Sequence, residues 1–227
     1  LFYALYCNYY IAFMICIFVV IWYILYSFKS VKQFFFRGIA FTFYSFLAAG
    51  MAAIMLIPAY LGIKQTASGE SMSLPEHSFL TNAADLLNRQ FAMWTPITHD
   101  NFDGNVNLYI GIFTVLAVVL YLLNSKIKIS EKIKKVLLIG FFYLSFSEMI
   151  LNFIWHGFHD QYGIPNRYAF LYIFALLAMA YEGYCVLARG QRKISMGIYT
   201  SVILFGILIE MAIQTVTVKI EMKTVYT

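Results

Sequence analysis

The sequence predicts an all-α fold, a polytopic transmembrane helix bundle of about six spans. Of 227 residues, 62% are hydrophobic and only 12% are charged, whereas a soluble domain carries about 25% charged residues. The apolar residues also gather in stretches of roughly 20, the length at which a helix crosses about 30 Å of hydrocarbon. Because backbone polar groups in lipid must be paired within their own segment, we expect these stretches to be helices.

The predicted spans follow one another along residues 4–27, 38–62, 108–123, 136–154, 168–188 and 194–214. Together they make residues 1–214 a transmembrane helical region. The first span starts close to Leu1 without a basic leader or a cleavage site, so we do not interpret it as a signal peptide. Residues 215–227 alternate β-branched and polar side chains, which predicts the start of an extracytoplasmic β-like region. We therefore expect the chain to be an internal fragment of a longer protein.

The charges of the connecting loops predict the orientation in the membrane. Lysine and arginine concentrate in the loops after the first, third and fifth spans, which are expected to be cytoplasmic. The basic residues of these loops are Lys29, Lys32, Arg37, Lys126, Lys128, Lys132, Lys134, Lys135, Arg189, Arg192 and Lys193. The loops at 64–107 and 155–167 lack this excess, so we expect them, and both chain ends, on the extracytoplasmic side. Membrane topology accounts for the net charge of +5, so the expected partner is membrane lipid and not nucleic acid.

The long outer loop, residues 64–107, contains one amphipathic stretch. Phe79, Ala83, Leu87 and Phe91 recur at helical spacing and share one face. This pattern predicts a helix that lies flat on the membrane surface.

No metal site and no cofactor motif is identified. Cys7, Cys16 and Cys185 all fall inside apolar spans, where a thiol usually acts as a small hydrophobic group. Asp103 and Gly104 belong to a segment that faintly resembles a calcium loop, but the acidic residue at loop position twelve is missing. An Asp-Gly turn is the preferred interpretation, and whether a divalent metal is required stays open.

The most polar outer link is WHGFHDQYGIPNR at residues 155–167. His156, His159 and Asp160 could transfer a proton or orient a substrate, and Arg167 could hold a phosphate with its planar set of donors. The alternative is a hydrated turn in which Arg167 extends to the interface from the start of a helix. Both interpretations stay open from the residues alone.

Glu148, Asn152 and His156 stand four residues apart in the fourth predicted span, so they are expected on one face of a helix. A carboxylate at this depth costs about 2.5 to 3.5 kcal/mol on insertion scales, so it normally faces a cavity or a partner. The three residues could form the polar wall of an outward-facing site. The alternative, an interhelical hydrogen bond, is about as plausible for Glu148 and is preferred for Asn152.

Asn8, Tyr9 and Tyr10 form a polar patch near the outer end of the first span. They could bind a lipid headgroup, or they could belong to the aromatic belt at the membrane interface. Glu182 and Glu210 are acids in other spans without polar companions at helical spacing, and we expect them to be packing or interface groups.

Four stretches together resemble the YfhO family of bacterial membrane proteins, and through it the GT-C glycosyltransferases. They are NYYIAFMICIF at 8–18, LAAGMAAIMLIPA at 47–59, NLYIGIFTVLAVVLYLLN at 107–124 and IWHGFHDQYGIPNRYAFLYIF at 154–174. The resemblance implies a GT-C-like domain in the bacterial cell membrane. It also implies transfer of a sugar from a polyprenyl-phosphate carrier to an extracytoplasmic cell-envelope polymer such as lipoteichoic acid.

The resemblance places the catalytic carboxylate upstream of Leu1, so no catalytic residue is assigned here. The positions that match the family as binding or wall residues are Asn8, Tyr9, Tyr10, His156, Pro165 and Arg167. To these the helical spacing adds Glu148. We expect Arg167 and His156 to hold the carrier phosphate while negative charge develops on the leaving group.

Two other functions remain open from the sequence. Acids within spans, such as Glu148, Glu182 and Glu210, can form the path of a transporter or lipid flippase, although no internal repeat is evident. The chain could also serve as a non-catalytic membrane scaffold for cell-envelope assembly. Whether the chain takes part in an enzyme is therefore a hypothesis at this point.

Overall fold

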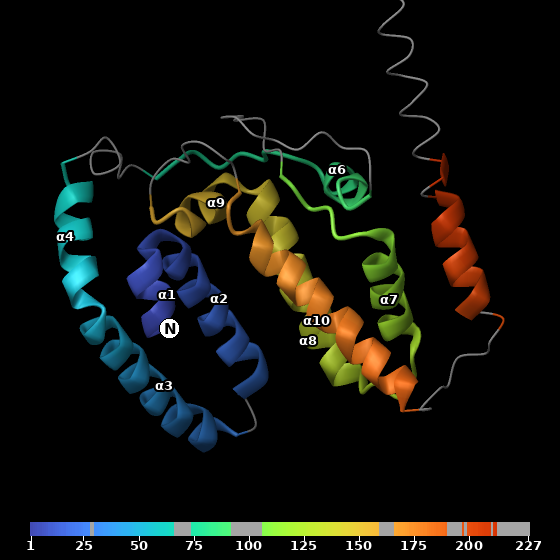
Figure 1. Ribbon diagram of the computed structural model, residues 1–227, viewed down its shortest axis with the longest axis horizontal. Helices are drawn as coiled ribbons and strands as arrows, with labels where there is room; N and C mark the ends of the chain where they lie inside the picture. The colour runs from blue at the N-terminus through green and yellow to red at the C-terminus, as the bar shows by residue number, and fades with distance from the viewer. Residues whose placement is uncertain are drawn as a thin grey trace, which may run out of the picture.

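The computed structural model describes residues 1–27, 30–65, 74–91, 106–158, 166–189, 197, 199–209 and 211–212. The helices within them are α1 (Phe2–Cys7), α2 (Tyr9–Ser27), α3 (Val31–Met51), α4 (Ala53–Ile63), α6 (Ala83–Asn88), α7 (Ile112–Leu123), α8 (Ile129–Ser147), α9 (Met149–Trp155) and α10 (Ala169–Ala188). A further helix spans Tyr199–Ile209. The predicted all-α class is confirmed (Figure 1).

The core of the molecule lies where α2, α8, α9 and α10 meet. Phe142 of α8 is fully buried and contacts Phe18 of α2, Trp155 of α9 and Tyr172 of α10, with ring centroids 5.6 to 6.2 Å apart. α7 covers the other side of α10, and α3 and α4 form an arm on the far side of α1 and α2 (Figure 1). The aromatic residues of α8 therefore join both halves of the bundle.

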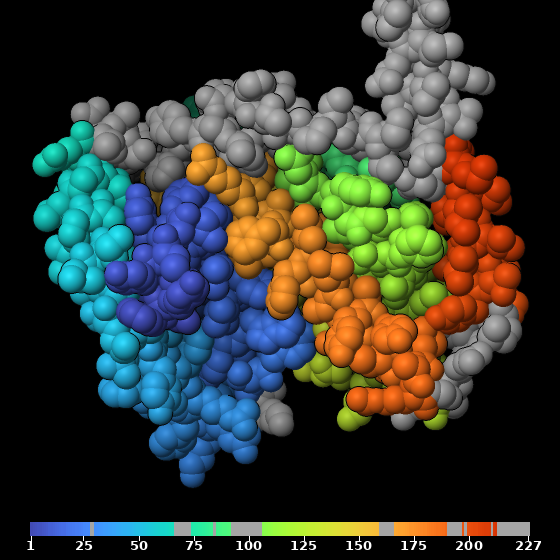
Figure 2. Space-filling model, viewed as in Figure 1, coloured from blue at the N-terminus to red at the C-terminus, as the bar shows by residue number. Residues whose placement is uncertain are grey.

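The described helices suit a membrane. α2, α3 and α10 are long and apolar enough to cross one, while Ala53–Ile63, Ile112–Leu123 and Tyr199–Ile209 are shorter apolar helices. α3 has no buried residue, and large apolar side chains such as Phe35, Phe46 and Ile54 stand exposed along the α3–α4 arm. The arm and the Tyr199–Ile209 helix form the two flanks of the molecule (Figure 2). Exposed apolar faces of this size fit a lipid environment and not water.

Two of the predicted spans are interrupted near the N-terminus. The segment predicted at 4–27 breaks at Asn8, whose backbone is extended at φ −156° and ψ 97°. The side-chain oxygen of Asn8 accepts a hydrogen bond from the Ile11 amide at 3.1 Å, so Asn8 caps α2. The segment predicted at 38–62 changes direction at Ala52, between α3 and α4.

The fourth predicted span is interrupted at Glu148. Its backbone is extended at φ −108° and ψ 127°, and its carboxylate accepts a hydrogen bond from the Leu151 amide at 2.8 Å. Glu148 therefore ends α8 and caps α9. The predicted fourth span is thus broken at Glu148, but the spacing of four residues continues beyond the break. The Asn152 amide donates to the Glu148 carbonyl at 3.0 Å, and the His156 amide donates to the Asn152 carbonyl at 3.1 Å.

The amphipathic helix predicted over the outer loop is also corrected. α6 covers only Ala83–Asn88, Leu86 is fully buried, and Phe79 and Leu87 are exposed. The residues before α6 pair with the break in α8 and α9 in extended form: the Leu80 amide donates to the Ser147 carbonyl at 2.7 Å. The residues before α6 thus pair with the α8–α9 break and do not continue the predicted helix. Several predicted features lie outside the described residues. They are Asp103 and Gly104 of the calcium-like stretch, His159, Asp160, Pro165, Glu210 and the β-like region 215–227.

Candidate functional site

A groove of about 770 Å³ lies between the corner of α1 and α2 and the facing side of α4. Four of the residues singled out from the sequence line it, namely Asn8, Tyr9, Tyr10 and Arg167. They come from positions up to 159 residues apart (167 minus 8). The fold therefore brings the polar patch of the first span to the arginine of the outer link.

The break at Asn8 creates one wall of this groove. Because Asn8 is extended, α1 ends there and α2 begins in a new direction, which leaves Asn8 and Tyr9 exposed at the corner. Tyr6 and Cys7, at the end of α1, complete this wall. The extended backbone at Asn8 thus forms the corner that borders the groove.

The guanidinium of Arg167 lies over the ring of Tyr10, with its Cζ atom 5.3 Å from the ring centroid. Arg167 is exposed and Tyr10 is half-buried. A cation over an aromatic face within about 6 Å is attracted by the ring quadrupole. This contact holds the arginine at the groove wall, where its N–H donors suit a phosphate or carboxylate.

The opposite wall is apolar and belongs to α4. It consists of Ile54, Met55, Pro58, Ala59 and Ile63. The groove thus combines an arginine, an asparagine and tyrosines on one side with apolar side chains on the other. Such a surface suits an amphiphile that carries an anionic head and a hydrocarbon chain. The sequence pattern had not identified α4 as a wall, because its apolar residues are typical of any membrane helix.

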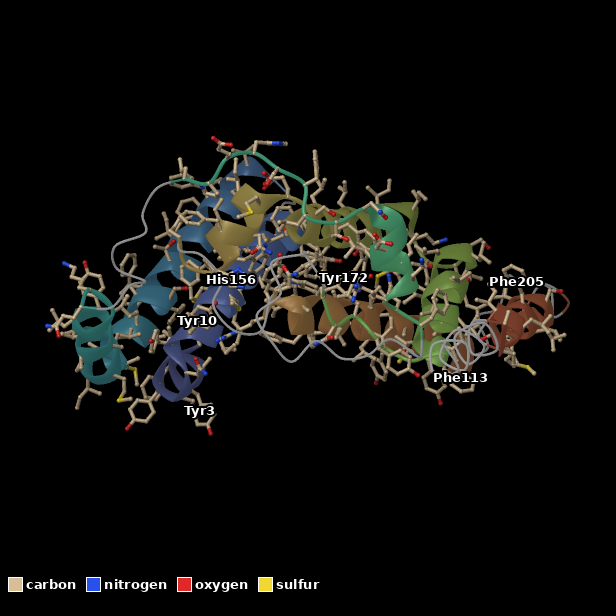
Figure 3. The ribbon with its side chains drawn as sticks, turned by 90° about the horizontal axis from the view of Figure 1, so that it is seen from above. Tyr3, Tyr10, Phe113, His156, Tyr172 and Phe205 are labelled. Carbon is tan, nitrogen blue, oxygen red and sulfur yellow. The ribbon has the colours of Figure 1, made fainter. Side chains whose placement is uncertain are left out.

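His156 lies behind the groove wall and is 1% exposed. Its Nδ1 atom is 2.8 Å from the Asn152 carbonyl oxygen. Its ring contacts Tyr10 at a centroid distance of 6.4 Å and Tyr168 at 5.7 Å. Figure 3 shows Tyr10 and His156 beside each other, with Tyr3 apart from both. His156 therefore supports Tyr10 and does not line the groove.

Glu148 is not among the groove-lining residues. Its carboxylate caps α9, and its Oε1 atom lies 3.9 Å from Nε2 of His77. The carboxylate side chain is largely buried beneath the residues that precede α6. The structure gives this residue a local role at a helix break and does not bring it to Arg167.

Asn152, Asn166 and Tyr168 form a buried polar cluster that the sequence analysis did not assemble. The Asn152 amide donates to the Asn166 side-chain oxygen and, at 3.2 Å, to the Tyr168 hydroxyl. Asn152 was expected to make an interhelical hydrogen bond; it bonds instead to the turn that precedes α10. The signal that could have suggested the cluster is an asparagine near each end of the polar link, at residues 152 and 166.

Within the residues that the structure describes, no group of three or more histidine, cysteine or acidic side chains is placed to hold a metal ion. Cys7, Cys16 and Cys185 are free thiols. Cys7 is exposed and lines the groove, which makes it a natural reporter of groove occupancy.

Comparison with protein families finds a match to the family model described as bacterial membrane protein YfhO, over residues 1–226. Comparisons with curated proteins and with solved structures gave no match.

Proposed function

Because this chain belongs to the family of bacterial membrane protein YfhO, we propose that its groove binds the lipid-phosphate part of a polyprenyl-phosphate-linked sugar. The full protein would be a glycosyltransferase that delivers this sugar to an extracytoplasmic cell-envelope polymer such as lipoteichoic acid. The observation that carries the proposal is the position of Arg167 over Tyr10, facing an apolar wall of α4.

The two walls match the two chemical parts of such a carrier. A phosphate ester accepts hydrogen bonds from an arginine in a charge-assisted geometry that is stronger than a neutral hydrogen bond. Asn8 uses its side-chain oxygen to cap α2, which leaves its NH₂ group as a further donor at the same wall. The isoprenoid chain is hydrocarbon, and the exposed aliphatic residues of α4 offer it a surface continuous with the membrane.

The proposed role of Arg167 is electrostatic. Cleavage of a sugar–phosphate bond leaves additional negative charge on the carrier phosphate, and a fixed cation that meets this charge lowers the barrier. The carboxylate that activates the acceptor is not assigned to any residue of this chain. For the groove to meet an extracytoplasmic acceptor, the corner of α1 and α2 must face outward, as the loop charges predict.

The direct test uses full-length protein with Arg167→Ala and Arg167→Lys. We expect Arg167→Ala to lower sugar transfer by about 10²-fold, as does removal of a donor that meets developing charge elsewhere. Arg167→Lys keeps the charge but loses the planar donor set, so it should fall in between. Arg189→Ala, at the opposite end of α10, is the matched control and should transfer normally. Unchanged transfer by a well-inserted Arg167→Ala protein would refute the proposal.

A binding measurement separates the two parts of the ligand. Polyprenyl phosphate should bind the full-length protein more tightly than either polyprenol, which lacks the phosphate, or inorganic phosphate, which lacks the chain. Equal affinity for polyprenyl phosphate and polyprenol would contradict the proposed contact between Arg167 and the phosphate.

A second function is favoured by the helix breaks. Transporters often build their sites from discontinuous membrane helices, and this chain is interrupted at Asn8 and at Glu148. On that view the groove would pass a lipid carrier across the membrane without chemistry. Purified protein that moves polyprenyl phosphate between leaflets but transfers no sugar would favour the transporter.

A further inference from the structure

Arg167 is held between two residues whose conformations are fixed from within the protein. Asn166, directly before it, has φ of +51°, in the left-handed region that side-chain-bearing residues seldom adopt. Asparagine tolerates this region better than most residues. Asn166 is 1% exposed, and its carbonyl accepts the Ala169 amide at 2.9 Å, which starts α10. The direction of Arg167 therefore depends on the conformation of Asn166.

The break at Glu148 supplies the partner that holds Tyr168, directly after Arg167. In a continuous helix the Ser145 carbonyl would accept the Met149 amide, four residues on. Here the Met149 amide donates instead to the Ser78 carbonyl at 3.1 Å. The Ser145 carbonyl accepts the Tyr168 hydroxyl at 2.7 Å. The Ser145 carbonyl, which the break in α8 leaves without its helical partner, is thus hydrogen-bonded by Tyr168 at the start of α10.

Asn152 ties these two residues together. Its amide group has two hydrogens, one for the Asn166 side-chain oxygen and one for the Tyr168 hydroxyl oxygen. The Tyr168 ring is stacked between Phe146 and Trp155, with centroid distances of 5.1 and 4.7 Å and interplanar angles near parallel. The side chains of the residues on both sides of Arg167 are therefore bonded to α8 and α9.

The same cluster also contacts Tyr10, whose ring lies under the guanidinium of Arg167. His156 packs on the edge of Tyr168 and against Tyr10, and Tyr10 carries the guanidinium of Arg167. The buried cluster thus positions the arginine from one side and its aromatic support from the other.

We propose that Asn152 and Asn166 are positioning residues for substrate binding. They hold the left-handed turn that places Arg167 over Tyr10, and they act on the lipid phosphate through Arg167 without touching it. This proposal rests on the proposed function of the groove. It also gives the break at Glu148 a role, because the break leaves the Ser145 carbonyl available to the Tyr168 hydroxyl.

The test is a double-mutant cycle on full-length protein in nanodiscs, with polyprenyl phosphate as the probe. Asn166→Ala and Asn152→Ala should each weaken its binding by about tenfold, within the usual range of coupling between linked residues. In an Arg167→Ala background, Asn166→Ala should add no further loss, because its effect passes through the arginine. A purely structural role would not produce this dependence on residue 167.

Asn124→Ala is the matched control. Asn124 is also buried, and its side-chain oxygen accepts the Lys126 amide at 2.9 Å near the end of α7. We expect this variant to lose thermal stability to a similar degree while its dissociation constant for polyprenyl phosphate stays unchanged. If Asn166→Ala does not insert, Asn166→Gly replaces it in the cycle, since glycine adopts the positive φ but lacks the side-chain oxygen.

Three results would overturn the proposal. One is unchanged affinity in the Asn166 and Asn152 variants. Another is the same fold-loss in the wild-type and Arg167→Ala backgrounds. The third is a parallel loss of affinity in Asn124→Ala. If Arg167→Ala alone binds polyprenyl phosphate like wild type, the proposed function of the groove fails as well. If Arg167→Ala binds weakly while the asparagine variants bind like wild type, only the positioning role fails.

Discussion

Tyr10 supports the proposed phosphate-binding arginine, and its ring and its hydroxyl can be tested separately. Tyr10→Phe keeps the aromatic face under Arg167 and the contact with His156, so binding of polyprenyl phosphate should change little. Tyr10→Leu removes the ring and with it an attraction of about 0.5 to 1 kcal/mol at an exposed site. We expect a two- to fivefold weaker binding for Tyr10→Leu, where ~1.4 kcal/mol corresponds to tenfold.

Tyr3→Leu is the control for this pair, because Tyr3 is exposed on α1 and is not among the groove-lining residues. Isothermal titration or fluorescence binding on full-length protein would measure all three variants. Equal affinities for Tyr10→Phe and Tyr10→Leu would mean that the aromatic face does not support the arginine.

At the residue scale, the sequence was informative where the chemistry is local. Asn8 precedes an apolar run, which is a recognisable helix-start signal, and Asn8, Tyr9 and Tyr10 do line a groove with Arg167. His156 was expected at the phosphate, but it is buried behind Tyr10. Spacing along one chain could not show this, because the residue that separates His156 from the groove comes from another helix.

Gly183 sets the distance between α7 and α10. A Cβ atom added there would lie 3.2 Å from the Tyr121 Cβ atom and 3.5 Å from the Ala117 carbonyl oxygen. Gly183→Leu should therefore push the helices apart and cost about 1 to 3 kcal/mol, the usual range for overpacking. A lower unfolding temperature of the full-length protein in detergent would be the readout.

The control for this prediction is Gly140→Leu in α8. An added Cβ atom at Gly140 meets nothing within 4 Å, and leucine is a better helix former than glycine. Its unfolding temperature should stay the same or rise. Equal losses in the two variants would show that the α7–α10 contact does not depend on the small residue.

At the element scale, the apolar runs predicted helices correctly but not their interruptions. Glutamate is a good helix former, so nothing in the local sequence marks Glu148 as the end of α8. The break is stabilised by distant partners, since residues 78 and 80 exchange backbone hydrogen bonds with Met149 and Ser147. Those partners also explain why the predicted amphipathic helix is shortened to α6.

A buried lysine and a glutamate hold together the end of the bundle away from the groove. Toward the end of α10 away from the groove, the Lys135 ammonium of α8 pairs with the Glu182 carboxylate at 2.5 Å. Lys135 is 3% exposed and also faces the rings of Trp22 and Tyr121. Glu182 has no polar companion at helical spacing and was expected to be a packing or interface group; its partner Lys135 lies 47 residues away in the chain, where helical spacing could not indicate it.

This ion pair predicts an asymmetry between two substitutions. Glu182→Ala leaves the buried Lys135 ammonium without its carboxylate, and we expect a loss of about 1 to 3 kcal/mol of stability. Lys135→Met removes the charge with the buried group and leaves a half-exposed carboxylate, so it should cost less. The double variant Glu182→Ala/Lys135→Met should recover most of the loss of Glu182→Ala. Chemical unfolding of the three full-length variants would test this, and additive losses would contradict it.

On the scale of the whole molecule, composition and the apolar stretches of roughly 20 residues together predicted the class, because a chain with 62% hydrophobic residues gathered in such stretches suits lipid and not water. The orientation of the ends stays a prediction from the loop charges. The association of α1, α2, α4 and the start of α10 into one groove could not be predicted, since it depends on how separate helices pack around the core.

The central claim is that this groove opens to the outside and holds a lipid phosphate through Arg167. The most direct measurement is the rate at which a membrane-impermeant maleimide alkylates Cys7, in right-side-out vesicles with full-length protein whose other cysteines are replaced by serine. Cys7 is exposed and lines the groove. We predict that it reacts from the outside, that polyprenyl phosphate slows the reaction, and that Arg167→Ala abolishes this protection. Reaction only in inverted vesicles, or a rate unaffected by polyprenyl phosphate, would contradict the account.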